Sequence, residues 1–489
     1  MSDRGLREAL MMNWMDKRVI VIGVARQGLA LGRYLAQHGA YVVMNDQKPA
    51  DQLRGARDSL SDLGEETASR IEWVCGSHPL TLLDGADFVC PSGGVPLTLP
   101  LVQEAIRRGI PLTNDSQVFL EACPCLTIGI TGSAGKTTTT SLVGKIAQVA
   151  VDTNTCTVFR KVWVGGNIGA PLLSMLEEMR ENDLAVLELS SFQLELMTKS
   201  VNIACILNIT PNHLDRHASM NEYLAAKRRI LEIQTENDVA ILGRDDPGAW
   251  GLSGEVIGRC ALFGKEQPPA GVKGAFIQDD WLCLSDGYKP SQVLRVADIQ
   301  LRGWHNVENI LAACAISQAA GLPVSAMREA ILAFTGVPHR LEWVNLWRGA
   351  DWYNDSIATA PERVMAAIHS FDTPVDLVRP IVLLAGGRDK NLPWTELAEL
   401  IHQRVKHLVL FGEAAEKIAA VVGVVTPGLQ PDSIEICSSL EQAVKSAARL
   451  IEPGGIVLLS PGGTSFDEFR DFEERGEAFK RWVFNLSCM

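Results

Sequence analysis

The sequence predicts an α/β protein made of three consecutive domains. Its 489 residues exceed what one hydrophobic core normally supports, and about three domains is the usual organisation at this length. Short apolar segments, bounded by glycine turns, alternate with helical segments, which indicates buried and largely parallel strands. The pattern breaks near residues 123–125 and again at 336–338. We therefore expect domains over residues 1–123, 124–337 and 338–489.

Composition narrows the class of protein. A hydrophobic content of 47% and a charged content of 21% are typical of a globular protein, and the net charge of −13 disfavours binding to nucleic acid or to an anionic membrane. The 11 cysteines are scattered, and Cys123-Pro124-Cys125 lacks the spacing of a CxxC site, so we expect reduced thiols in a cytoplasmic protein. Neither a signal peptide nor a membrane-spanning segment is expected.

The first domain opens with a strand, a glycine turn and a helix, followed by a second strand. The turn runs from Gly23 to Gly28, and Asp46 follows the second strand. A dinucleotide fingerprint has a glycine where Ala25 stands, and that glycine lets the backbone approach a pyrophosphate. Three interpretations stay open: an NAD site, a site for the diphosphate of another nucleotide with Asp46 nearby, or a plain turn between strand and helix.

The second domain begins with a phosphate-binding loop. An apolar strand through Ile130 and Thr131 runs into glycines and then Gly-Lys-Thr, ahead of a helix expected over residues 139–150. Backbone amides and the helix N-terminus can surround phosphate oxygens, Lys136 can reach the β- and γ-phosphates, and Thr137 can ligate Mg²⁺. Ile130 stands where the common P-loop has its first glycine, so this is a shorter variant. The expected ATP-binding residues here are Gly132, Ser133, Ala134, Gly135, Lys136, Thr137, Thr138 and Thr139.

Three further side chains of the second domain are candidates for chemistry. Glu188 ends a predicted strand, where it can hold Mg²⁺ or simply face solvent. His213 and His217 are four residues apart, but without a third ligand zinc is not expected. Ser219-Met-Asn-Glu222 reads as a capping box, which predicts the start of a helix. Lys227 lies about two turns into that helix, and its position alone favours a solvated helix face.

The other predicted elements follow the same alternating pattern. Residues 245–300 read as hairpins or peripheral strands, and a helix is expected over 306–320. Arg340, near the break, can either move onto the γ-phosphate or form an interdomain salt bridge. The expected strands lie at 18–22, 40–44, 86–90, 184–189, 204–209, 343–347, 352–354, 381–385, 407–411 and 455–460.

Three polar or glycine-rich loops of the third domain follow predicted strands. They cover residues 354–359, 386–390 and 460–466. Loops at the carboxyl ends of parallel strands are where α/β sheets bind ligands, so we expect these loops to form one site.

These segments together resemble the Mur ligases over nearly the whole chain. The resemblance rests on residues 130–138, 165–169, 188–195, 208–216, 226–227, 305–309 and 338–340, and the ending at 460–476 is typical of members that add D-glutamate. It implies a Rossmann-like UDP-binding domain, a P-loop ATPase domain and a Rossmann-like amino-acid domain. It also implies an enzyme that uses ATP to join D-glutamate to UDP-N-acetylmuramoyl-L-alanine through an acyl phosphate, in the cytoplasmic stage of peptidoglycan synthesis. We expect this enzyme to be a monomer.

The resemblance assigns roles to individual residues. Two Mg²⁺ ions are implied, with Thr137, Glu188, His213 and a carbamylated Lys227 as ligands. Further ATP contacts are implied for Asn309, Arg340 and Asp355. Contacts to the UDP-sugar or to the amino acid are implied for Asp46, Gly93, Asn167, Ser190, Thr359, Lys390, Ser465, Phe466 and Phe472.

Two departures from the family pattern qualify these roles. Ile357 stands where a lysine is common, so Lys390 or Arg388 must supply the positive charge for the amino acid's carboxylate. Pro91-Ser92-Gly93-Gly94 replaces the usual Ser-Pro-Gly of the uridine site. The alternatives are a Mur-type ligase for a different amino acid, a nucleotide-dependent oxidoreductase and a non-catalytic ATP sensor.

Overall fold

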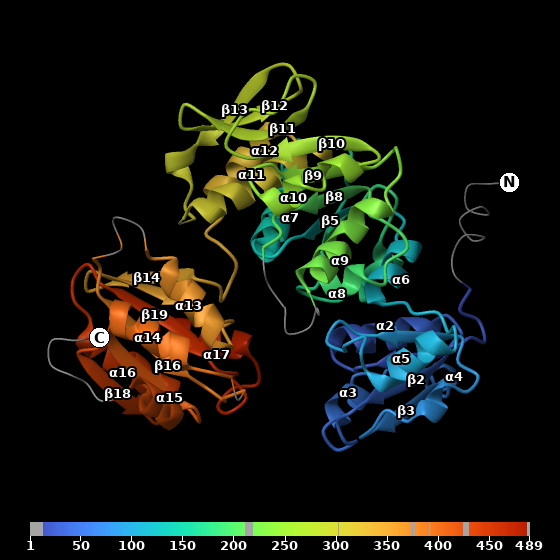
Figure 1. The fold of residues 1–489 in the computed structure, drawn as a ribbon, viewed down its shortest axis with the longest axis horizontal. Helices are drawn as coiled ribbons and strands as arrows, with labels where there is room; N and C mark the ends of the chain where they lie inside the picture. Colours follow the sequence, from blue (N-terminus) through green and yellow to red (C-terminus); the bar gives the residue numbers. More distant parts are fainter. Residues whose placement is uncertain are drawn as a thin grey trace. The chain divides into compact units, whose positions relative to one another are not determined.

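A computed structural model of the chain describes residues 13–210, 219–301, 303–372, 376, 378–390, 392–423 and 430–486. The chain divides into two compact units (Figure 1). One contains residues up to 299 together with 304–333, and the other contains residues 300–303 together with 334 onward. Each unit is described by itself.

The first unit begins with a four-stranded parallel sheet in the order β3-β2-β1-β4. Alternate side chains of β1 face opposite layers: Val19 and Val21 pack with Leu35 of α2, whereas Ile20 packs with Val102 of α5. The elements are β1 (Arg18–Ile22), α2 (Arg26–Gln37), β2 (Tyr41–Asp46), α3 (Arg54–Asp58), α4 (Glu65–Ala68), β3 (Ile71–Cys75), η1 (Leu80–Leu83), β4 (Phe88–Pro91), α5 (Pro100–Arg107) and α6 (Asp115–Ala122).

A nine-stranded sheet follows in the same unit, in the order β13-β12-β11-β10-β9-β8-β5-β7-β6. It is parallel from β6 to β11, and the hairpins β11–β12 and β12–β13 extend it as antiparallel strands. The elements are β5 (Leu126–Thr131), α7 (Lys136–Asp152), β6 (Val162–Gly166), η2 (Leu172–Glu178), β7 (Leu184–Glu188), α8 (Ser191–Leu194), β8 (Ile203–Ile206), α9 (Met220–Glu232), β9 (Val239–Gly243), α10 (Pro247–Trp250), η3 (Ser253–Glu255), β10 (Arg259–Phe263), β11 (Lys273–Gln278), β12 (Trp281–Ser285), β13 (Pro290–Arg295), η4 (Val296–Asp298), α11 (Trp304–Ala319) and α12 (Val324–Leu332).

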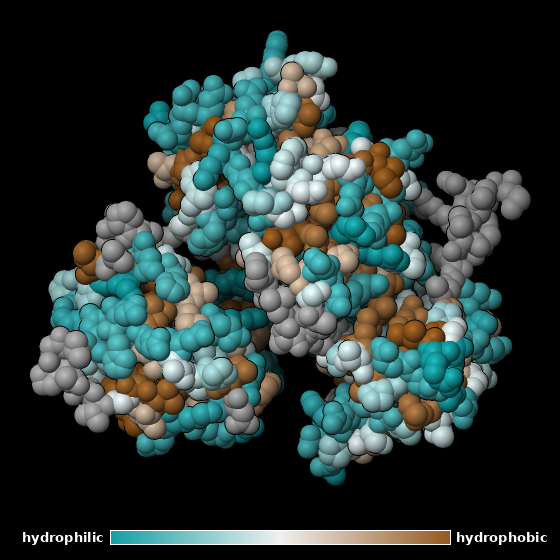
Figure 2. Space-filling model, viewed as in Figure 1, coloured by the Kyte–Doolittle hydropathy of each residue, from teal (hydrophilic) through white to brown (hydrophobic). Residues whose placement is uncertain are grey.

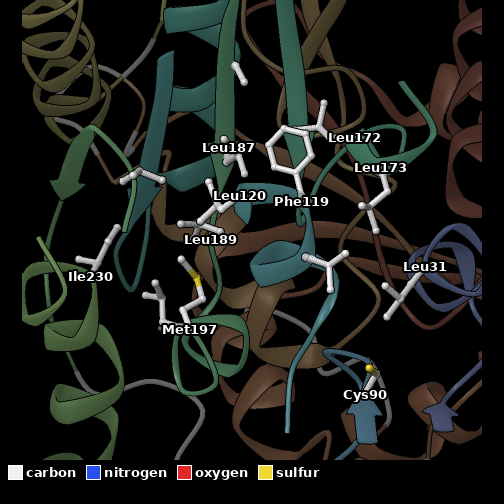
Figure 3. Packing of buried hydrophobic residues seen from close by; sticks show 14 of the residues in the cluster. Leu31, Cys90, Phe119, Leu120, Leu172, Leu173, Leu187, Leu189, Met197 and Ile230 are labelled. Carbon is white, nitrogen blue, oxygen red and sulfur yellow. The ribbon is translucent and has the colours of Figure 1, made fainter. Parts of the chain in front are cut away.

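Helix α6 joins the two sheets of the first unit. Its buried residues Phe119 and Leu120 lie in one cluster with Leu31 of α2 and with Leu187 at the end of β7 (Figure 3). Asn114 caps the helix and donates through its side-chain amide to the backbone oxygen of Gln193 at 2.7 Å. The two sheets therefore share a continuous apolar core, which explains why they form one compact unit.

The second unit contains a six-stranded sheet in the order β14-β15-β19-β16-β17-β18. Only the hairpin β14–β15 is antiparallel among these described strands. Helices α13, α14 and α15 cover one face, and α16 and α17 cover the other. The elements are β14 (Glu342–Trp347), β15 (Ala350–Asn354), α13 (Pro361–His369), β16 (Ile381–Gly386), α14 (Thr395–Arg404), β17 (Val405–Phe411), α15 (Ala415–Val422), β18 (Ser433–Cys437), α16 (Leu440–Leu450), β19 (Ile456–Gly462) and α17 (Phe472–Leu486).

The predicted α/β class and the mainly parallel strands are confirmed. The helix after the phosphate loop was placed wrongly, because α7 begins at Lys136 rather than Thr139. Gly135 has a φ of +82° and ends the loop, so the helix can start at once and carries Lys136 and Thr137 in its first turn. Sequence analysis also missed β3, β6 and β18, whose apolar character is weak or interrupted by glycine, and β9, a short apolar run that is fully buried.

The described surface is mainly hydrophilic on the face in view, with small scattered hydrophobic patches (Figure 2). Among the helices of the described residues, none combines the length and apolar character needed to cross a bilayer.

Candidate functional site

The phosphate loop between β5 and α7 has the shape that its glycines predict. A Cβ atom on Gly135 would lie 2.0 Å from Oδ1 of Asn309, and the φ of +82° also favours glycine. Asn208 fixes the other side of the loop: its backbone oxygen accepts from the amide of Ser133 at 2.9 Å, and its Oδ1 accepts from the amide of Ala134 at 2.8 Å. The first amides of α7 have no acceptor within the helix, so they suit a phosphate group.

Lys136 lies over this loop. Its Nζ donates to the backbone oxygen of Gly132 at 2.8 Å and to that of Ser133 at 3.2 Å. Neutral carbonyls are weak partners for an ammonium group compared with a phosphate oxygen, so the side chain can exchange them for a bound phosphate.

Glu188 lies beside the loop because β7 is the neighbour of β5. It pairs with Ile130 on one side and with Gly166 of β6 on the other, and its side chain is buried. Oε2 accepts from the hydroxyl of Thr137 at 2.8 Å, and Oε1 accepts from Nδ2 of Asn167 at 3.0 Å. The interpretation of Glu188 as a solvent-facing carboxylate is therefore wrong, and three predicted site residues meet in one place.

Lys227 also belongs to this cluster. Its Nζ donates to the backbone oxygen of Gly132 at 2.8 Å and to Oγ1 of Thr131 at 3.3 Å, and the side chain is 1% exposed. The expectation of a solvated helix face is wrong, because α9 turns this side toward the phosphate loop. Burial, reinforced by the nearby charge of Lys136 and opposed by that of Glu188, lowers the pKa of Lys227 well below its usual value.

Two hydrogen bonds hold the first part of α9, the helix that carries Lys227. The Oγ of Ser219 accepts from the amide of Glu222 at 3.2 Å, which confirms the N-cap half of the predicted capping box. Tyr223, one turn before Lys227, donates its hydroxyl to Oγ of Ser133 at 3.0 Å. Tyr223 was not identified from the sequence, since a tyrosine on a helix carries no signal of which loop it meets.

The donor chemistry beside the loop fits Mg²⁺. The hydroxyl of Thr137 and the carboxylate of Glu188 are hard oxygen donors, which that ion prefers. Among the described residues, no three or more histidines, cysteines and acidic residues gather as a metal cluster. His213, the remaining predicted ligand, lies outside the described residues.

The first glycine turn is held by the acid that follows β2. Oδ2 of Asp46 accepts from the amide of Val24 at 3.0 Å, and Oδ1 accepts from the amide of Lys48 at 2.9 Å. Gln27 in the same turn donates to the backbone oxygen of Gly166 at 2.6 Å, which ties the turn to the nine-stranded sheet. Asp46 therefore supports the glycine turn through Oδ2 and the segment after β2 through Oδ1.

A pocket lies between the first sheet and helix α8. Gly93, Asn114, Phe192 and Gln193 contribute to its lining. Ser190, a predicted substrate contact, instead caps α8: its Oγ accepts from the amide of Gln193 at 3.3 Å, and its amide donates to Oε1 of Gln193 at 3.0 Å. Gly93 therefore lines the pocket, whereas Ser190 is the N-cap of α8.

The three predicted loops of the second unit do meet. Ser460, which the structure places within β19, donates to Oδ2 of Asp355 at 2.9 Å, which joins the predicted segment 460–466 to the loop after β15. Arg388 pairs with Thr464 through backbone hydrogen bonds, which joins the loops after β16 and β19. Lys390 donates to Oγ1 of Thr359 at 3.1 Å, which joins the loops after β16 and β15.

Arg475, in the first turn of α17, links two of these loops through hydrogen bonds. Its guanidinium donates to the hydroxyl and backbone oxygen of Ser356 at 3.0 and 2.8 Å and to the backbone oxygen of Gly463 at 3.1 and 3.2 Å. A Cβ on Gly387 would lie 2.9 Å from Nη1. Burial lowers the pKa of Arg475 to about 10. An arginine is seldom this buried, so sequence reasoning had no local signal for its role.

Arg388 and Lys390, the two cations that can replace the lysine missing at position 357, differ in their ion-pair partners. Arg388 already forms a bidentate pair with Glu413, both contacts being 2.9 Å. Within the part of the chain that the structure describes, Lys390 has no carboxylate at ion-pair distance. Burial, with the charges of Arg363 and Arg475, lowers its pKa, which is the environment of a site that gains from a bound anion.

The remaining predicted residues of the second unit lie around the same loops. Ser465 is buried, Phe466 is largely exposed, and the ring of Phe472 packs edge-on against His339 with centroids 6.2 Å apart. Asp355 is buried, and that burial raises its pKa to about 7 despite hydrogen bonds from Ser460 and the amide of Leu341. Arg340 belongs to this unit as well.

Family models match the three parts of the chain in order. Residues 17–114 match the Mur ligase MurD-like N-terminal domain, 130–317 match the Mur ligase middle domain, and 339–463 match the Mur ligase glutamate ligase domain. The chain therefore belongs to the Mur ligase family.

Its relatives specify one branch of that family. The UDP-N-acetylmuramoylalanine--D-glutamate ligase of Symbiobacterium thermophilum is 39% identical over 97% of this chain and 99% of the relative. The enzymes of the same name from Acetivibrio thermocellus and Koribacter versatilis are each 38% identical, over 97% and 96% of this chain and 97% and 98% of theirs.

Solved structures share the fold at lower identity. A pseudomurein peptide ligase type C from Methanothermus fervidus aligns with a TM-score of 0.53 at 17% identity, over 96% of this chain and 100% of that structure. A MurF ligase from Thermotoga maritima in complex with ADP aligns at 0.51 and 16% identity, over 97% and 100%.

Proposed function

We propose that the protein is an ATP-dependent ligase that joins D-glutamate to UDP-N-acetylmuramoyl-L-alanine. The observation that carries this proposal is the cluster of Lys136, Thr137, Glu188 and Lys227 around one phosphate loop. Membership of the Mur ligase family and the names of the 35–39% identical relatives support the choice of substrates. Peptidoglycan synthesis is the process to which such a ligase belongs.

The proposed reaction has two chemical steps. The carboxylate of the alanyl substrate attacks the γ-phosphorus of ATP, which gives an acyl phosphate and ADP. The D-glutamate amine then attacks the acyl carbon, an amide forms, a proton leaves the nitrogen and phosphate departs. Since a carboxylate is a poor acyl donor, the phosphoryl group serves to create a leaving group, and the protein contributes position and charge.

The residues of the loop divide this work. The amides of 135–137 and Nζ of Lys136 would hold the phosphates, with Asn309 beside Gly135. Thr137, Glu188 and His213 would hold Mg²⁺, which neutralises phosphate charge when bound. Asn167, which donates to Glu188, orients that carboxylate and would contact the UDP-sugar. Arg340 and Asp355 are proposed as ATP contacts from the second unit.

Lys227 is proposed to act as a carbamate. Its lowered pKa increases the neutral fraction of the amine, and only the neutral amine adds to CO₂, with loss of a proton. The modified side chain would carry a negative charge within the cluster and could serve a second Mg²⁺. Modification would replace the present contacts of Nζ with Gly132 and Thr131.

The loops of the second unit are proposed as the amino-acid site. Lys390 would meet a carboxylate of D-glutamate, and Thr359, Ser465, Phe466 and Phe472 would shape the pocket. The UDP-sugar is proposed to lie along the first unit, from Asp46 and Gly93 toward Asn167 and Ser190. The three domains would keep the boundaries 1–123, 124–337 and 338–489, and the protein would act as a cytoplasmic monomer.

A substrate comparison tests the proposal. Phosphate release is measured with ATP, Mg²⁺ and UDP-N-acetylmuramoyl-L-alanine, and D-glutamate is compared with L-glutamate and other amino acids. Release that depends on D-glutamate supports the proposal. Release only with another amino acid would reassign the substrate of the second unit, for which Ile357 gives the reason. ATP binding with no substrate-dependent release would indicate a sensor, and NAD(H) binding would favour the oxidoreductase.

Two matched variants test the amino-acid site. Lys390→Met should raise the KM for D-glutamate at least about 10-fold, because one charge-assisted hydrogen bond contributes roughly 1.5 to 3 kcal/mol. Arg388→Met should change that KM less, since Glu413 already neutralises its guanidinium. The KM for ATP serves as the internal control. Equal effects of both variants on the amino acid would contradict the assignment of Lys390.

A further inference from the structure

The short connection between α6 and β5 contains two thiols whose sulfur atoms are close together. The Sγ atoms of Cys123 and Cys125 lie 3.5 Å apart, and neither is in a disulfide. Side chains two residues apart on extended backbone point to the same side, and the bend at Cys125 leaves the two sulfurs near each other. The proposed ligase reaction uses neither thiol.

We propose that Cys123 and Cys125 form a redox modification site that closes to an intramolecular disulfide when the protein meets a disulfide oxidant such as oxidised glutathione. The sulfurs must approach from 3.5 Å to about 2.05 Å, which rotation of the two side chains and a small shift of the bend can supply. Cys123 is the C-cap of α6, and its amide donates to the backbone oxygen of Phe119 at 2.8 Å, so the approach must come mainly from side-chain rotation and from the bend at Cys125.

The two thiols have different surroundings, which sets the order of reaction. Cys123 is partly exposed, whereas Cys125 is buried at 8% exposure. A hydrogen bond from Cys125 and the charge of Lys199 lower the pKa of Cys123, and the same bond together with burial raises the pKa of Cys125. Lys199 is held nearby by its hydrogen bond to the backbone oxygen of Leu120 at 2.8 Å. Cys123 is therefore the attacking thiolate.

The reaction balances with the disulfide oxidant as electron acceptor. The thiolate of Cys123 attacks one sulfur of oxidised glutathione, which forms a mixed disulfide and releases one glutathione thiolate. Cys125 loses its proton and attacks Sγ of Cys123, which forms the internal disulfide and releases the second glutathione. Two electrons from the protein thiols thereby reduce one oxidised glutathione to two thiols. The site directly precedes β5, whose far end carries the phosphate loop.

Oxidation of the folded full-length protein tests the proposal. After incubation with oxidised glutathione, free thiols are alkylated and the peptide that contains both cysteines is examined by mass spectrometry. We expect the wild-type peptide to carry an internal disulfide and no glutathione. The Cys125→Ser variant should keep one glutathione on Cys123, because the resolving thiol is absent. The Cys156→Ser variant, which removes a buried thiol elsewhere, should form the internal disulfide as the wild type does.

Two results would overturn the proposal, provided that the far-ultraviolet circular dichroism shows a folded protein. One is a wild-type protein in which both cysteines remain open to alkylation while Cys125→Ser also takes up no glutathione. The other is a wild-type protein that retains glutathione on Cys123, since the second thiol then fails to displace it. Dithiothreitol should restore both thiols of the oxidised wild type.

Discussion

Replacement of Lys227 by methionine separates the role of this residue in chemistry from its role in structure. The side chain is buried, and its Nζ makes two hydrogen bonds, to Gly132 and to Thr131. Loss of these bonds costs about 1 to 3 kcal/mol. Gly132 keeps the hydrogen bond from Lys136, and methionine fills nearly the same space without the cost of burying an amine, which offsets most of the loss.

We therefore expect Lys227→Met to change the free energy of unfolding by no more than about 1 kcal/mol, which corresponds to roughly 2 to 4 °C in the Tm of a domain of this size. Turnover, in contrast, should fall at least about 100-fold, as expected when one charge that stabilises the transition state is removed from a buried site. Calorimetry and phosphate release on the same preparation measure the two effects. Lys145→Met, on an exposed face of α7, is the matched control and should change neither.

Rescue tests whether the missing charge is that of a carbamate. Lys227→Ala leaves space in the cluster, so short carboxylates such as acetate should restore part of its activity, whereas Lys227→Met should not respond. A Lys227→Met protein that keeps more than about a tenth of wild-type turnover would refute the reasoning. So would a large loss of stability, because the activity could then be lost through unfolding.

Three other substitutions follow from the geometry. Gly135→Ala should abolish ATP binding measured by calorimetry, because its Cβ would meet Asn309 at 2.0 Å and the left-handed backbone adds about 1 to 2 kcal/mol of strain. Asp355 has a raised pKa of about 7 in the folded state, so wild-type stability should fall by a few kcal/mol as pH rises from about 4 to 7, and Asp355→Asn should flatten that dependence in calorimetric scans. Arg475→Met should destabilise the second unit by about 2 to 4 kcal/mol in urea titrations and raise the KM for the amino acid, because the carbonyls of Ser356 and Gly463 lose their donors.

The predictions for Gly135 and Arg475 each have a control variant in the same chain. Gly254→Ala should keep ATP binding, because nothing lies within 4 Å of the added methyl group. Arg449→Met, on the exposed side of α16, should leave the urea midpoint unchanged. Equal slopes of stability against pH for wild type and Asp355→Asn would show that this carboxyl is not the group that titrates. Normal ATP affinity in Gly135→Ala would exclude the loop as the phosphate site.

Local patterns determined most of the secondary structure and the position of the phosphate loop. Apolar runs between glycine turns identified the parallel strands, because a buried strand must be apolar on both faces. Gly135 and Lys136 could also be identified from local sequence, since a positive φ and a free helix N-terminus depend on residues that are neighbours in the chain. Strands with weak apolar character, such as β3 and β18, gave too little contrast to be found.

The composition of the site was decided by tertiary structure. Glu188 and Lys227 are 39 residues apart, and a solvent-facing position was left open for Glu188 and favoured for Lys227 by its local sequence. The order of β5, β6 and β7 placed Glu188 beside Thr137, and the packing of α9 placed Lys227 against Gly132 of the same loop. Arg475 lies more than a hundred residues from Ser356, which it holds, and no local pattern records that contact. Sequence fixes which groups are available within a few residues, through backbone geometry and periodicity. Which of them meet depends on sheet order and helix packing, because those set the distances between residues that are far apart in the chain.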